Sequence, residues 1–333
     1  MTKIATIIVN FNGMKWVDAC LTSVIKQKLP NHYESEIIFI DNGSTDGSEK
    51  LVKDKFPEVI VITLPQNLGF GSACNLGVSG TNAELIVILN NDTILNDGTL
   101  SCLLTELLTH SLDAIAAIEV PYEGGTSNLR RTTIDLFGYP VHLYEGQRLS
   151  NLPSFYLSAV CLLFKRETYL DTNGFDEDFF MYFEDIDWFW RLQLQNYKFD
   201  YAYSCTVRHA GHGSTGGKKL SYDRFLWRNS NTPRMLIKNL RIGTLCWIMP
   251  LYYTSYIIEY LLLNILGRRD LARSYVDGMG VFTKNWRSLL KSRQMTQHSR
   301  TVGDWPIMKR MYPGIAKVHG LRSNGLPHFN GRI

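Results

Sequence analysis

The sequence predicts an α/β protein with a mostly parallel sheet and helices on both faces of that sheet. Short β-branched runs alternate with segments of helical apolar spacing over residues 4–120, which is the pattern of a parallel sheet. Carboxylates follow several of these runs where strands should end, and open α/β sheets bind their ligands at that edge. The 333 residues are 45% hydrophobic and 20% charged, which is enough for one large domain with an appendage.

The strands expected in the first 120 residues are apolar and rich in Ile and Val. They cover residues 4–9, 36–41, 59–64, 85–90 and 114–120. The helices expected between them cover residues 14–27, 48–56, 71–80 and 100–110. The first helix shows the kind of evidence used, because Val17, Leu21 and Val24 recur at helical spacing.

The alternating pattern loosens after Pro121. A stretch containing Gly, Ser and Arg predicts a loop or insertion up to about Pro153. Residues 157–164 predict another strand, and residues 184–197 predict a helix. The apolar residues of that helix that should pack inward are Ile186, Phe189, Leu192 and Leu194. Short strands and a glycine-rich loop are expected over residues 199–217.

An apolar run of 25 residues, 242–266, contains one charge, Glu259, and has basic residues on both flanks. Its length alone permits a membrane span. Pro250 in the middle, Glu259, the many Tyr residues and the positive charge at both ends favour a helix that lies in the membrane interface or re-enters it. A true span and a buried core helix are the alternatives.

Charge is divided unevenly along the chain. Residues 1–213 contain 15 Lys and Arg against 26 Asp and Glu, whereas residues 214–333 contain 20 against 5. A basic C-terminal third can bind nucleic acid or anionic lipid. Its aromatic residues lie in the apolar run rather than among the charges, which disfavours nucleic acid. The expected partner is therefore an anionic membrane surface.

The cysteines and the first residues bear on the compartment. The six cysteines are scattered, without a C-x-x-C motif or a zinc-type spacing, which predicts reduced thiols in a cytosolic protein. The opening sequence MTKIATIIVNFNG does not read as a signal peptide, because its apolar run is short and ends in Asn and Gly. We therefore expect a location on the cytoplasmic side.

Two aspartates stand at predicted strand ends. Asp41 begins the turn DNGSTDGS, where its carboxylate can accept hydrogen bonds from a base or a ribose. Asp92 directly follows residues 85–90, with polar Asn91 beside it. Mg²⁺ or Mn²⁺ takes one or two carboxylates and completes its shell with diphosphate oxygens and water, so Asp92 is a candidate metal ligand. The alternative for both is a local turn or cap.

The most distinctive segment is the acidic run of Glu184, Asp185 and Asp187 at a helix start. These carboxylates repel one another, and the helix N-terminus offsets the repulsion by only about 0.3–1 kcal/mol per charge. The aromatic residues around the run are Phe179, Phe180, Tyr182, Phe183, Trp188 and Trp190. Acids between aromatic walls are typical of a carbohydrate pocket, where a carboxylate can take a proton from an acceptor hydroxyl. Compensation of the helix dipole is the alternative for one or two of them.

Two histidines follow in the glycine-rich segment VRHAGHGS. His209 and His212 are candidates for contact with a metal or a diphosphate. His209 is the favoured one, and a purely structural histidine is the alternative.

Six motifs in register carry a family resemblance. They are TIIVNFNG, DNGSTDGS, QNLGFGSACNLGV, LNNDT, GFDEDFFMYFEDIDWFWR and HAGHGSTGG. In this order they resemble family 2 glycosyltransferases, and in particular the rhamnosyltransferase-like enzymes of bacterial surface polysaccharide synthesis. The resemblance covers about residues 4–240, and the tail also looks like the membrane-associating tail of that group. It implies a GT-A domain over residues 1–240 and a basic, apolar helical tail over residues 241–333.

The resemblance also implies a role for each matching residue. Those expected to bind the nucleotide donor are Asn10, Asp41, Asn67, Asn75 and Asn91. Asp92 matches the surviving acid of a DxD-type metal motif whose first position is Asn90, and His209 completes the site for Mg²⁺ or Mn²⁺. Asp185 matches the catalytic base of an inverting transfer. The neighbours expected to orient or bind the acceptor are Glu184, Asp187 and Trp188.

The expected substrates are a nucleotide-diphosphate sugar and a glycan or polyprenyl-linked acceptor at the cytoplasmic face of the cell membrane. A sugar-phosphate nucleotidyltransferase is an alternative, but it requires a Gly-rich basic loop where this chain has Asn-Phe-Asn-Gly. A Rossmann dehydrogenase is excluded because no G-x-G-x-x-G follows the first strand. An inactive, membrane-tethered carbohydrate-binding protein on the same fold is the remaining alternative.

Overall fold

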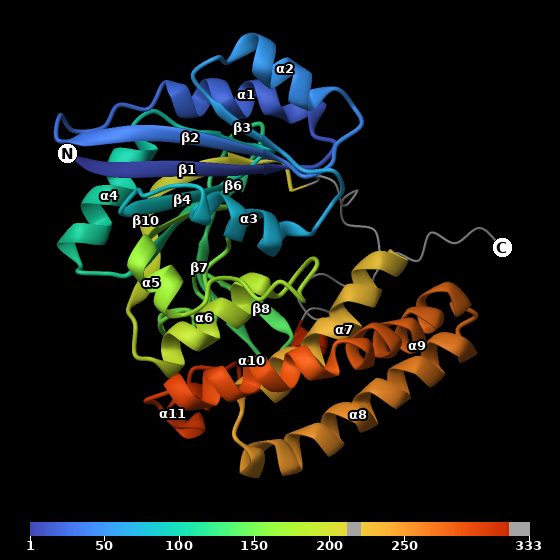
Figure 1. Ribbon diagram of the computed structural model, residues 1–333. Coiled ribbons are helices and arrows are strands. Elements are labelled where there is room, and N and C mark those ends of the chain that lie inside the picture. Colours follow the sequence, from blue (N-terminus) through green and yellow to red (C-terminus); the bar gives the residue numbers. More distant parts are fainter. Residues whose placement is uncertain (212–220, 320–333) are drawn as a thin grey trace.

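A computed structural model describes residues 1–211 and 221–319 (Figure 1). In these residues one sheet has eight strands in the order β3-β2-β1-β4-β9-β6-β10-β5. The strands are β1 (Thr2–Asn10), β2 (Tyr33–Asp41), β3 (Ile60–Thr63), β4 (Leu85–Asn90), β5 (Thr93–Leu95), β6 (Ala114–Pro121), β9 (Cys161–Lys165) and β10 (Phe199–His209). Strand β9 runs antiparallel to both of its neighbours and β5 antiparallel to β10, while the other pairs are parallel. The predicted mostly parallel sheet is confirmed.

Helices cover both faces of the sheet, as the alternation of elements predicts. On one face lie α1 (Met14–Ile25), α2 (Ser48–Lys55) and α4 (Thr99–Thr109), and on the other lie α3 (Phe70–Ser79) and α6 (Glu184–Leu194) (Figure 1). Side chains along β1 alternate between the two apolar cores. Ile4 and Ile8 enter the first core, which lies between the sheet and α1, α2 and α4, and Ala5 and Ile7 enter the second core, between the sheet and α3 and α6. The reason is that successive residues of a strand point to opposite faces.

The stretch expected to be a loop contains a hairpin. Strands β7 (Leu129–Ile134) and β8 (Pro140–Tyr144) pair antiparallel. Arg131, Thr132 and Thr133 of β7 are buried although they are polar, so the segment lacks the apolar signal of a strand. The hairpin is held by hydrogen bonds to other parts of the chain, such as the one that Arg131 Nε donates to the carbonyl of Pro153 (3.0 Å).

Three more elements differ from the prediction. Residues 157–160 are irregular, and only Cys161–Lys165 pair as β9. Residues 199–209 form one strand, β10, with a register shift between Ala202 and Thr206, instead of several short strands. A short helix, α5 (Arg166–Asp171), follows β9 without having been predicted.

The cysteine prediction is wrong for one pair. Cys102 on α4 and Cys205 in the irregular part of β10 form a disulfide, with Cα atoms 6.0 Å apart. They are 103 residues apart in the chain, so only the packing of α4 on β10 brings them together and no local spacing reveals them. The other four cysteines are free thiols.

The C-terminal part is helical and packs beneath the second core. It consists of α7 (Tyr222–Asn239), α8 (Ile242–Ile265), α9 (Arg269–Lys284), α10 (Trp286–Ser299) and α11 (Asp304–Met308) (Figure 1). Among residues 1–211 and 221–319, no helix has the length and apolarity that a membrane span requires. The division of the chain at residue 240 stays a prediction.

Candidate active site

A cavity of about 320 Å³ opens at the carboxyl ends of β1 and β4. It is lined by six of the residues singled out from the sequence: Asn67, Asn91, Asp92, Glu184, Asp185 and His209. Asp92 and Asp185 are far apart in the chain, yet both line this one cavity. Tyr182, one of the aromatic residues around the acidic run, also lines it, together with residues that the sequence analysis did not select, namely Phe11, Asn42 and Arg224.

Strand pairing places His209 beside Asp92. His209 is the last residue of β10 and pairs with Thr93, the first residue of β5, so the imidazole reaches the carboxylate that follows β4. His209 Nε2 lies 3.1 Å from Asp92 Oδ1, and Nδ1 lies 2.7 Å from Glu119 Oε2. Burial disfavours the imidazolium, but hydrogen bonds to the two carboxylates outweigh it and raise the pKa of His209 to about 10.

Glu119 on β6 is a member of this cluster that the sequence analysis missed. Burial opposes its ionisation, but the hydrogen bond and the charge of His209 lower the pKa of the Glu119 carboxyl. A signal was present in the sequence, since Glu119 is the only charged residue in the apolar strand Ala114–Pro121.

Asp92 and His209 fit two protein ligands of a divalent cation, with the cation taking the place of the proton that His209 Nε2 shares with Asp92, because a histidine binds a metal only after that nitrogen loses its proton. Ligating histidines usually donate the far ring nitrogen to a carboxylate, which is the position of Glu119 on Nδ1. Over the described part of the chain, no group of three or more His, Cys, Asp or Glu side chains gathers around a point that could hold a metal. A cation here therefore needs diphosphate oxygens and water to complete its shell, which is the ordinary habit of Mg²⁺ with nucleotides. His212 lies outside the described residues.

Glu184 and Asp185, at the start of α6, line the same cavity. Glu184 is 8% exposed, and its Oε2 has no hydrogen-bond partner among the described residues. Burial and the neighbouring Asp185 raise the pKa of Glu184 to about 8. Burial also raises the pKa of Asp185 to about 6. The backbone N–H of Ile186, which donates to Asp185 Oδ1 at 2.8 Å, acts in the other direction and lowers this pKa. Both pKa values are raised, and a negative charge on either carboxylate opposes ionisation of the other, so the pair tends to keep one proton.

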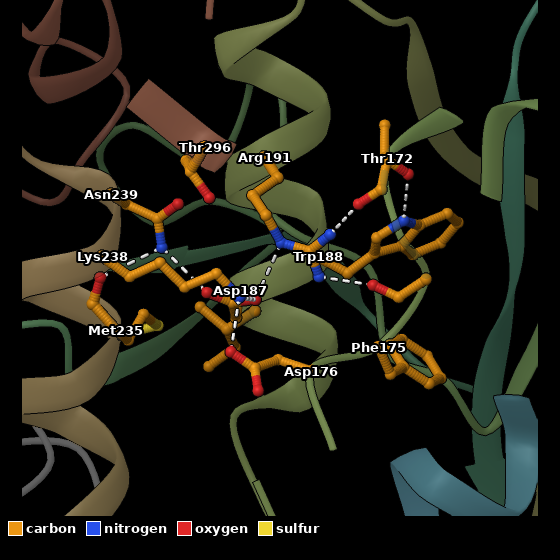
Figure 2. A network of polar contacts seen from close by, with 12 residues as sticks. Thr172, Phe175, Asp176, Asp187, Trp188, Arg191, Met235, Lys238, Asn239 and Thr296 are labelled. Carbon is orange, nitrogen blue, oxygen red and sulfur yellow. Dashed lines mark hydrogen bonds and ion pairs between the residues drawn. The ribbon is translucent and has the colours of Figure 1, made fainter. Parts of the chain in front are cut away.

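Asp187 is not among the residues that line the cavity and lies in a network of polar contacts (Figure 2). It is fully buried and pairs with Arg191 Nε (2.9 Å) and Lys238 Nζ (2.8 Å), and Asn239 Nδ2 donates to it (2.9 Å). An α-helix turns about 100° per residue, so residues 185 and 187 face nearly opposite directions. The expectation that Asp187 binds the acceptor is corrected, because it belongs to a buried ionic network.

Trp188 is also a structural residue and not part of an acceptor site. It is fully buried, its indole N–H donates to Thr172 Oγ1 at 2.8 Å, and its ring packs against Phe164, Tyr169 and Phe175. No face of the ring is left for a sugar.

Of the predicted donor-binding residues, Asn67 and Asn91 line the cavity, whereas Asn10 and Asp41 are buried behind Asn91. Asn91 Nδ2 donates to Asn10 Oδ1 (2.7 Å), and Asn10 Nδ2 donates to Asp41 Oδ1 (3.2 Å). Asn10 and Asp41 are buried, so they orient Asn91 from below. This close approach requires glycine at position 13, where a Cβ would meet Asn91 Nδ2 at 2.1 Å.

Asn75 lies elsewhere. Its Oδ1 accepts from the hydroxyl of Tyr169 (2.6 Å) and the N–H of Phe175 (3.2 Å). It lines a second cavity of about 330 Å³ beside α10, away from Asp92. Its expected place in the donor site is not supported by this geometry.

The comparisons with known proteins concern the same part of the chain. The family model described as Glycosyl transferase family 2 matches residues 6–171. The N-acetylglucosaminyl-diphospho-decaprenol L-rhamnosyltransferase of Mycobacterium tuberculosis is 28% identical over 214 residues, which are 56% of this chain and 70% of that protein.

Solved structures are similar over nearly the whole chain. GalNAc-T7 with UDP, GalNAc and Mn²⁺ has a TM-score of 0.63 at 14% identity, covering 98% of this chain and 58% of that one. Staphylococcus aureus TarS 1–349 in complex with UDP-GlcNAc has a TM-score of 0.54 at 18% identity, covering 93% of each chain. At these identities the structures establish a common fold and nothing further.

Proposed function

Because this chain belongs to glycosyltransferase family 2 and has the GT-A fold, we propose that it transfers a sugar from a nucleotide-diphosphate donor with inversion. The acceptor is a hydroxyl of a glycan or of a lipid-linked glycan in cell-surface polysaccharide synthesis. One observation carries the proposal: Asp92 and Asp185 face the same cavity. A candidate metal ligand and a candidate base thus line one cavity.

Asp185 is the base of the reaction. It takes the proton of the acceptor hydroxyl as that oxygen attacks the anomeric carbon from the face opposite the diphosphate. The bond from the anomeric carbon to the diphosphate oxygen breaks, so the products are an inverted glycoside and a nucleoside diphosphate. With its pKa raised to about 6 by burial, Asp185 is ionised at pH 7 and is a stronger base than an exposed aspartate.

Glu184 stays protonated at pH 7, since burial and Asp185 raise its pKa to about 8. Its Oε2 has no partner among the described residues, so it is available to hydrogen-bond a substrate hydroxyl. This retains Glu184 in the proposed acceptor site and excludes Asp187 and Trp188 from it.

Asp92 and His209 hold the leaving-group side of the site. When bound, a divalent cation supplies Lewis-acid compensation for the charge on the leaving diphosphate. Glu119 fixes the His209 ring so that Nε2 points toward Asp92. GalNAc-T7, which shares this fold, was solved with Mn²⁺.

The nucleoside is assigned to the side of the cavity formed by Phe11, Asn67 and Asn91. The Phe11 ring offers an apolar face to a base, and the two amides offer hydrogen bonds. Asn10 and Asp41 act from below by fixing the Asn91 side chain.

Helix α8 is proposed to bring the site to an anionic membrane surface on the cytoplasmic side. Ile257, Leu261 and Ile265 follow at four-residue spacing and are 55%, 51% and 80% exposed, and Figure 1 shows α8 at the outer edge of the helical layer. Its one charge, Glu259, is turned inward, where it accepts from the Tyr275 hydroxyl at 2.6 Å and pairs with Lys317. The outer face therefore remains apolar, as an interfacial helix requires.

The acceptor and the sugar are inferred from the relative. The mycobacterial protein is named as a rhamnosyltransferase acting on a decaprenol-linked saccharide, which supports rhamnose as the sugar and a polyprenyl-linked acceptor for this chain.

The donor is tested by saturation-transfer NMR with UDP-, GDP- and dTDP-sugars, with and without Mn²⁺. We expect one nucleotide class to bind, Mn²⁺ to strengthen its binding, and turnover to release nucleoside diphosphate. Absence of binding from the whole panel contradicts the proposal, and consumption of pyrophosphate indicates the nucleotidyltransferase alternative.

Membrane binding is tested by co-sedimentation with phosphatidylglycerol–phosphatidylcholine vesicles. The variant with Ile257, Leu261 and Ile265 all changed to Glu should lose binding. The matched control is Leu108→Glu on α4, which changes a side chain that is also 55% exposed. Equal binding by both variants contradicts the docking role of α8.

A further inference from the structure

The segment that leads into the catalytic helix has a strained backbone. Tyr182 and Phe183 have φ angles of 66° and 73°, in the left-handed region. Side chains with a Cβ rarely adopt this conformation, and bulky ones do so only when their surroundings impose it. The two residues immediately precede Glu184 and Asp185, so their conformation sets the direction in which the Asp185 carboxylate leaves the backbone.

One side chain holds this turn directly. Asn231, in the middle of α7, donates from Nδ2 to the carbonyl of Met181 and to the carbonyl of Tyr182, both at 2.9 Å. Asn231 is 2% exposed, and its Oδ1 accepts from the hydroxyl of Ser230 at 3.0 Å. The amide is thus fully engaged, with one donor hydrogen on the strained residue Tyr182 and the other on Met181, the residue before it.

The same face of α7 contacts the chain on both sides of the turn. The contacting residues recur every three or four positions and are Arg224, Trp227, Asn231, Arg234 and Lys238. Toward the N-terminus of α7, the Trp227 ring stacks on Phe180, with centroids 4.7 Å apart.

Toward the other end, α7 holds the acids that flank the turn. Arg234 pairs with Asp176 at 3.1 Å, and Lys238 pairs with Asp176 at 2.7 Å and with Asp187 at 2.8 Å (Figure 2). The segment 176–187 is therefore fastened to α7 before, at and after the left-handed residues, and Asn231 is the contact at the strained point itself.

We propose that Asn231 is a positioning residue for the catalytic base: it holds the Tyr182–Phe183 turn left-handed and so aims Asp185 into the cavity shared with Asp92. This inference rests on the proposed function of Asp185. It assigns to α7, in the C-terminal part of the chain, a role in the reaction in addition to packing.

Removing the amide should affect turnover more than donor binding. Displacement of a catalytic group by about 1 Å is enough to reduce a rate by about 10²-fold. The proposed donor-binding residues Asn67, Asn91 and Asp92 lie on other segments. For Asn231→Ala we expect kcat to fall about 10- to 100-fold, with the KM for the nucleotide sugar changed by less than about twofold.

The matched control is Thr232→Val. Thr232 is the next residue of α7, is fully buried, and donates its hydroxyl to the carbonyl of Arg228 within its own helix at 2.8 Å. The substitution removes a buried hydrogen bond of α7 without touching the turn. Asn231→Ser, which keeps a polar group too short to reach both carbonyls, replaces Asn231→Ala if the alanine variant does not fold.

The experiment combines hydrogen exchange with steady-state kinetics on the full chain. Exchange of the amides in 179–187 is followed by mass spectrometry for wild type, Asn231→Ala (or Asn231→Ser) and Thr232→Val. Turnover is measured with whichever of UDP-GlcNAc, GDP-mannose or dTDP-rhamnose the wild type accepts. We expect faster exchange in this segment together with the fall in kcat for the Asn231 variant, and wild-type values of both for Thr232→Val.

Three results overturn the inference: unchanged exchange, faster exchange with unchanged kcat, or an equal effect of Thr232→Val. Failure of the proposed function shows itself differently, as absence of turnover by the wild type with all three nucleotide sugars. In that case the exchange data still decide whether Asn231 holds the turn.

Discussion

Asp185 and Asp187 are two residues apart on one helix and have opposite environments. Asp185 faces the cavity, and burial without a cationic partner raises its pKa to about 6. Asp187 faces the interior, where burial opposes ionisation but Lys238 and Arg191 outweigh it and lower the pKa of its carboxyl. The carboxylate of Asp185 is kept reactive, whereas the negative charge of Asp187 is balanced by Lys238 and Arg191.

This contrast shows how the fold separates reaction from stability. Beside Asp185, Glu184 Oε2 has no hydrogen-bond partner among residues 1–211 and 221–319, and such a group is available to a substrate. The network around Asp187 satisfies its charge with cations from α6 and α7 (Figure 2). We therefore expect substitutions at the two positions to damage different properties.

The largest effect is expected for Asp185→Asn. Removal of a general base typically costs about 10²- to 10⁴-fold in rate, and turnover should fall by that factor while the affinity for nucleoside diphosphate changes less than about twofold. Thermal stability should not decrease, because burial disfavours this charge. Equal losses of turnover and nucleotide affinity, measured by kinetics and calorimetry, mean that Asp185 is structural.

The complementary substitution, Asp187→Asn, should mainly reduce stability. Removing one partner from a buried ion pair costs about 3–5 kcal/mol, and here it leaves Lys238 and Arg191 without their shared carboxylate. Urea unfolding measures the change in the free energy of unfolding. If this variant unfolds like wild type but has lost its turnover, the division between the two acids is incorrect.

A smaller effect is expected for Glu119→Gln, which weakens the hydrogen bond that orients His209. Losing such a partner typically lowers metal affinity about 10- to 100-fold, so the Mn²⁺-dependent gain in nucleotide binding should shrink by that factor. The exposed neighbour Glu123 provides the control, as Glu123→Gln. Calorimetric titration of both variants with Mn²⁺ and nucleoside diphosphate decides the point, and identical curves argue against a metal role for this cluster.

The smallest effect is the pH dependence of turnover. The pKa of Asp185 is raised to about 6, so its base form is lost as pH falls through 6, and kcat/KM should drop about tenfold between pH 7 and pH 5. The pKa of Asp187, in contrast, is lowered. Asp187 therefore stays ionised, and stabilises the fold, down to a pH below the usual pKa of an aspartate, and this contribution is lost only in stronger acid. A rate that is flat from pH 7 to pH 5 contradicts the base assignment.

The sequence predicted the parts of this structure that follow local rules. Alternating apolar runs and helical spacing identified most elements of the first 120 residues, and the strand-end rule identified Asp92 because its position follows directly from β4. The family motifs brought Asp185 and His209 into consideration, and these side chains lie in the same cavity as Asp92.

The missed features depend on contacts between distant segments. The hairpin β7–β8 is built on buried polar residues such as Thr133, which carry no strand signal. Neither the disulfide between Cys102 and Cys205 nor the inward turn of Asp187 toward Lys238 is visible without the packing of helices on the sheet. A list of neighbouring acids does not show which of them a helix will turn toward the interior.

The central claim is that the cavity between Asp92 and Asp185 is the donor site, and a crystal structure of Asp185→Asn with Mn²⁺ and the accepted nucleotide sugar tests it most directly. The account predicts Mn²⁺ and the diphosphate beside Asp92 and His209, with the anomeric carbon turned toward residue 185. A donor bound in the second cavity beside α10, or with its sugar turned away from residue 185, contradicts it.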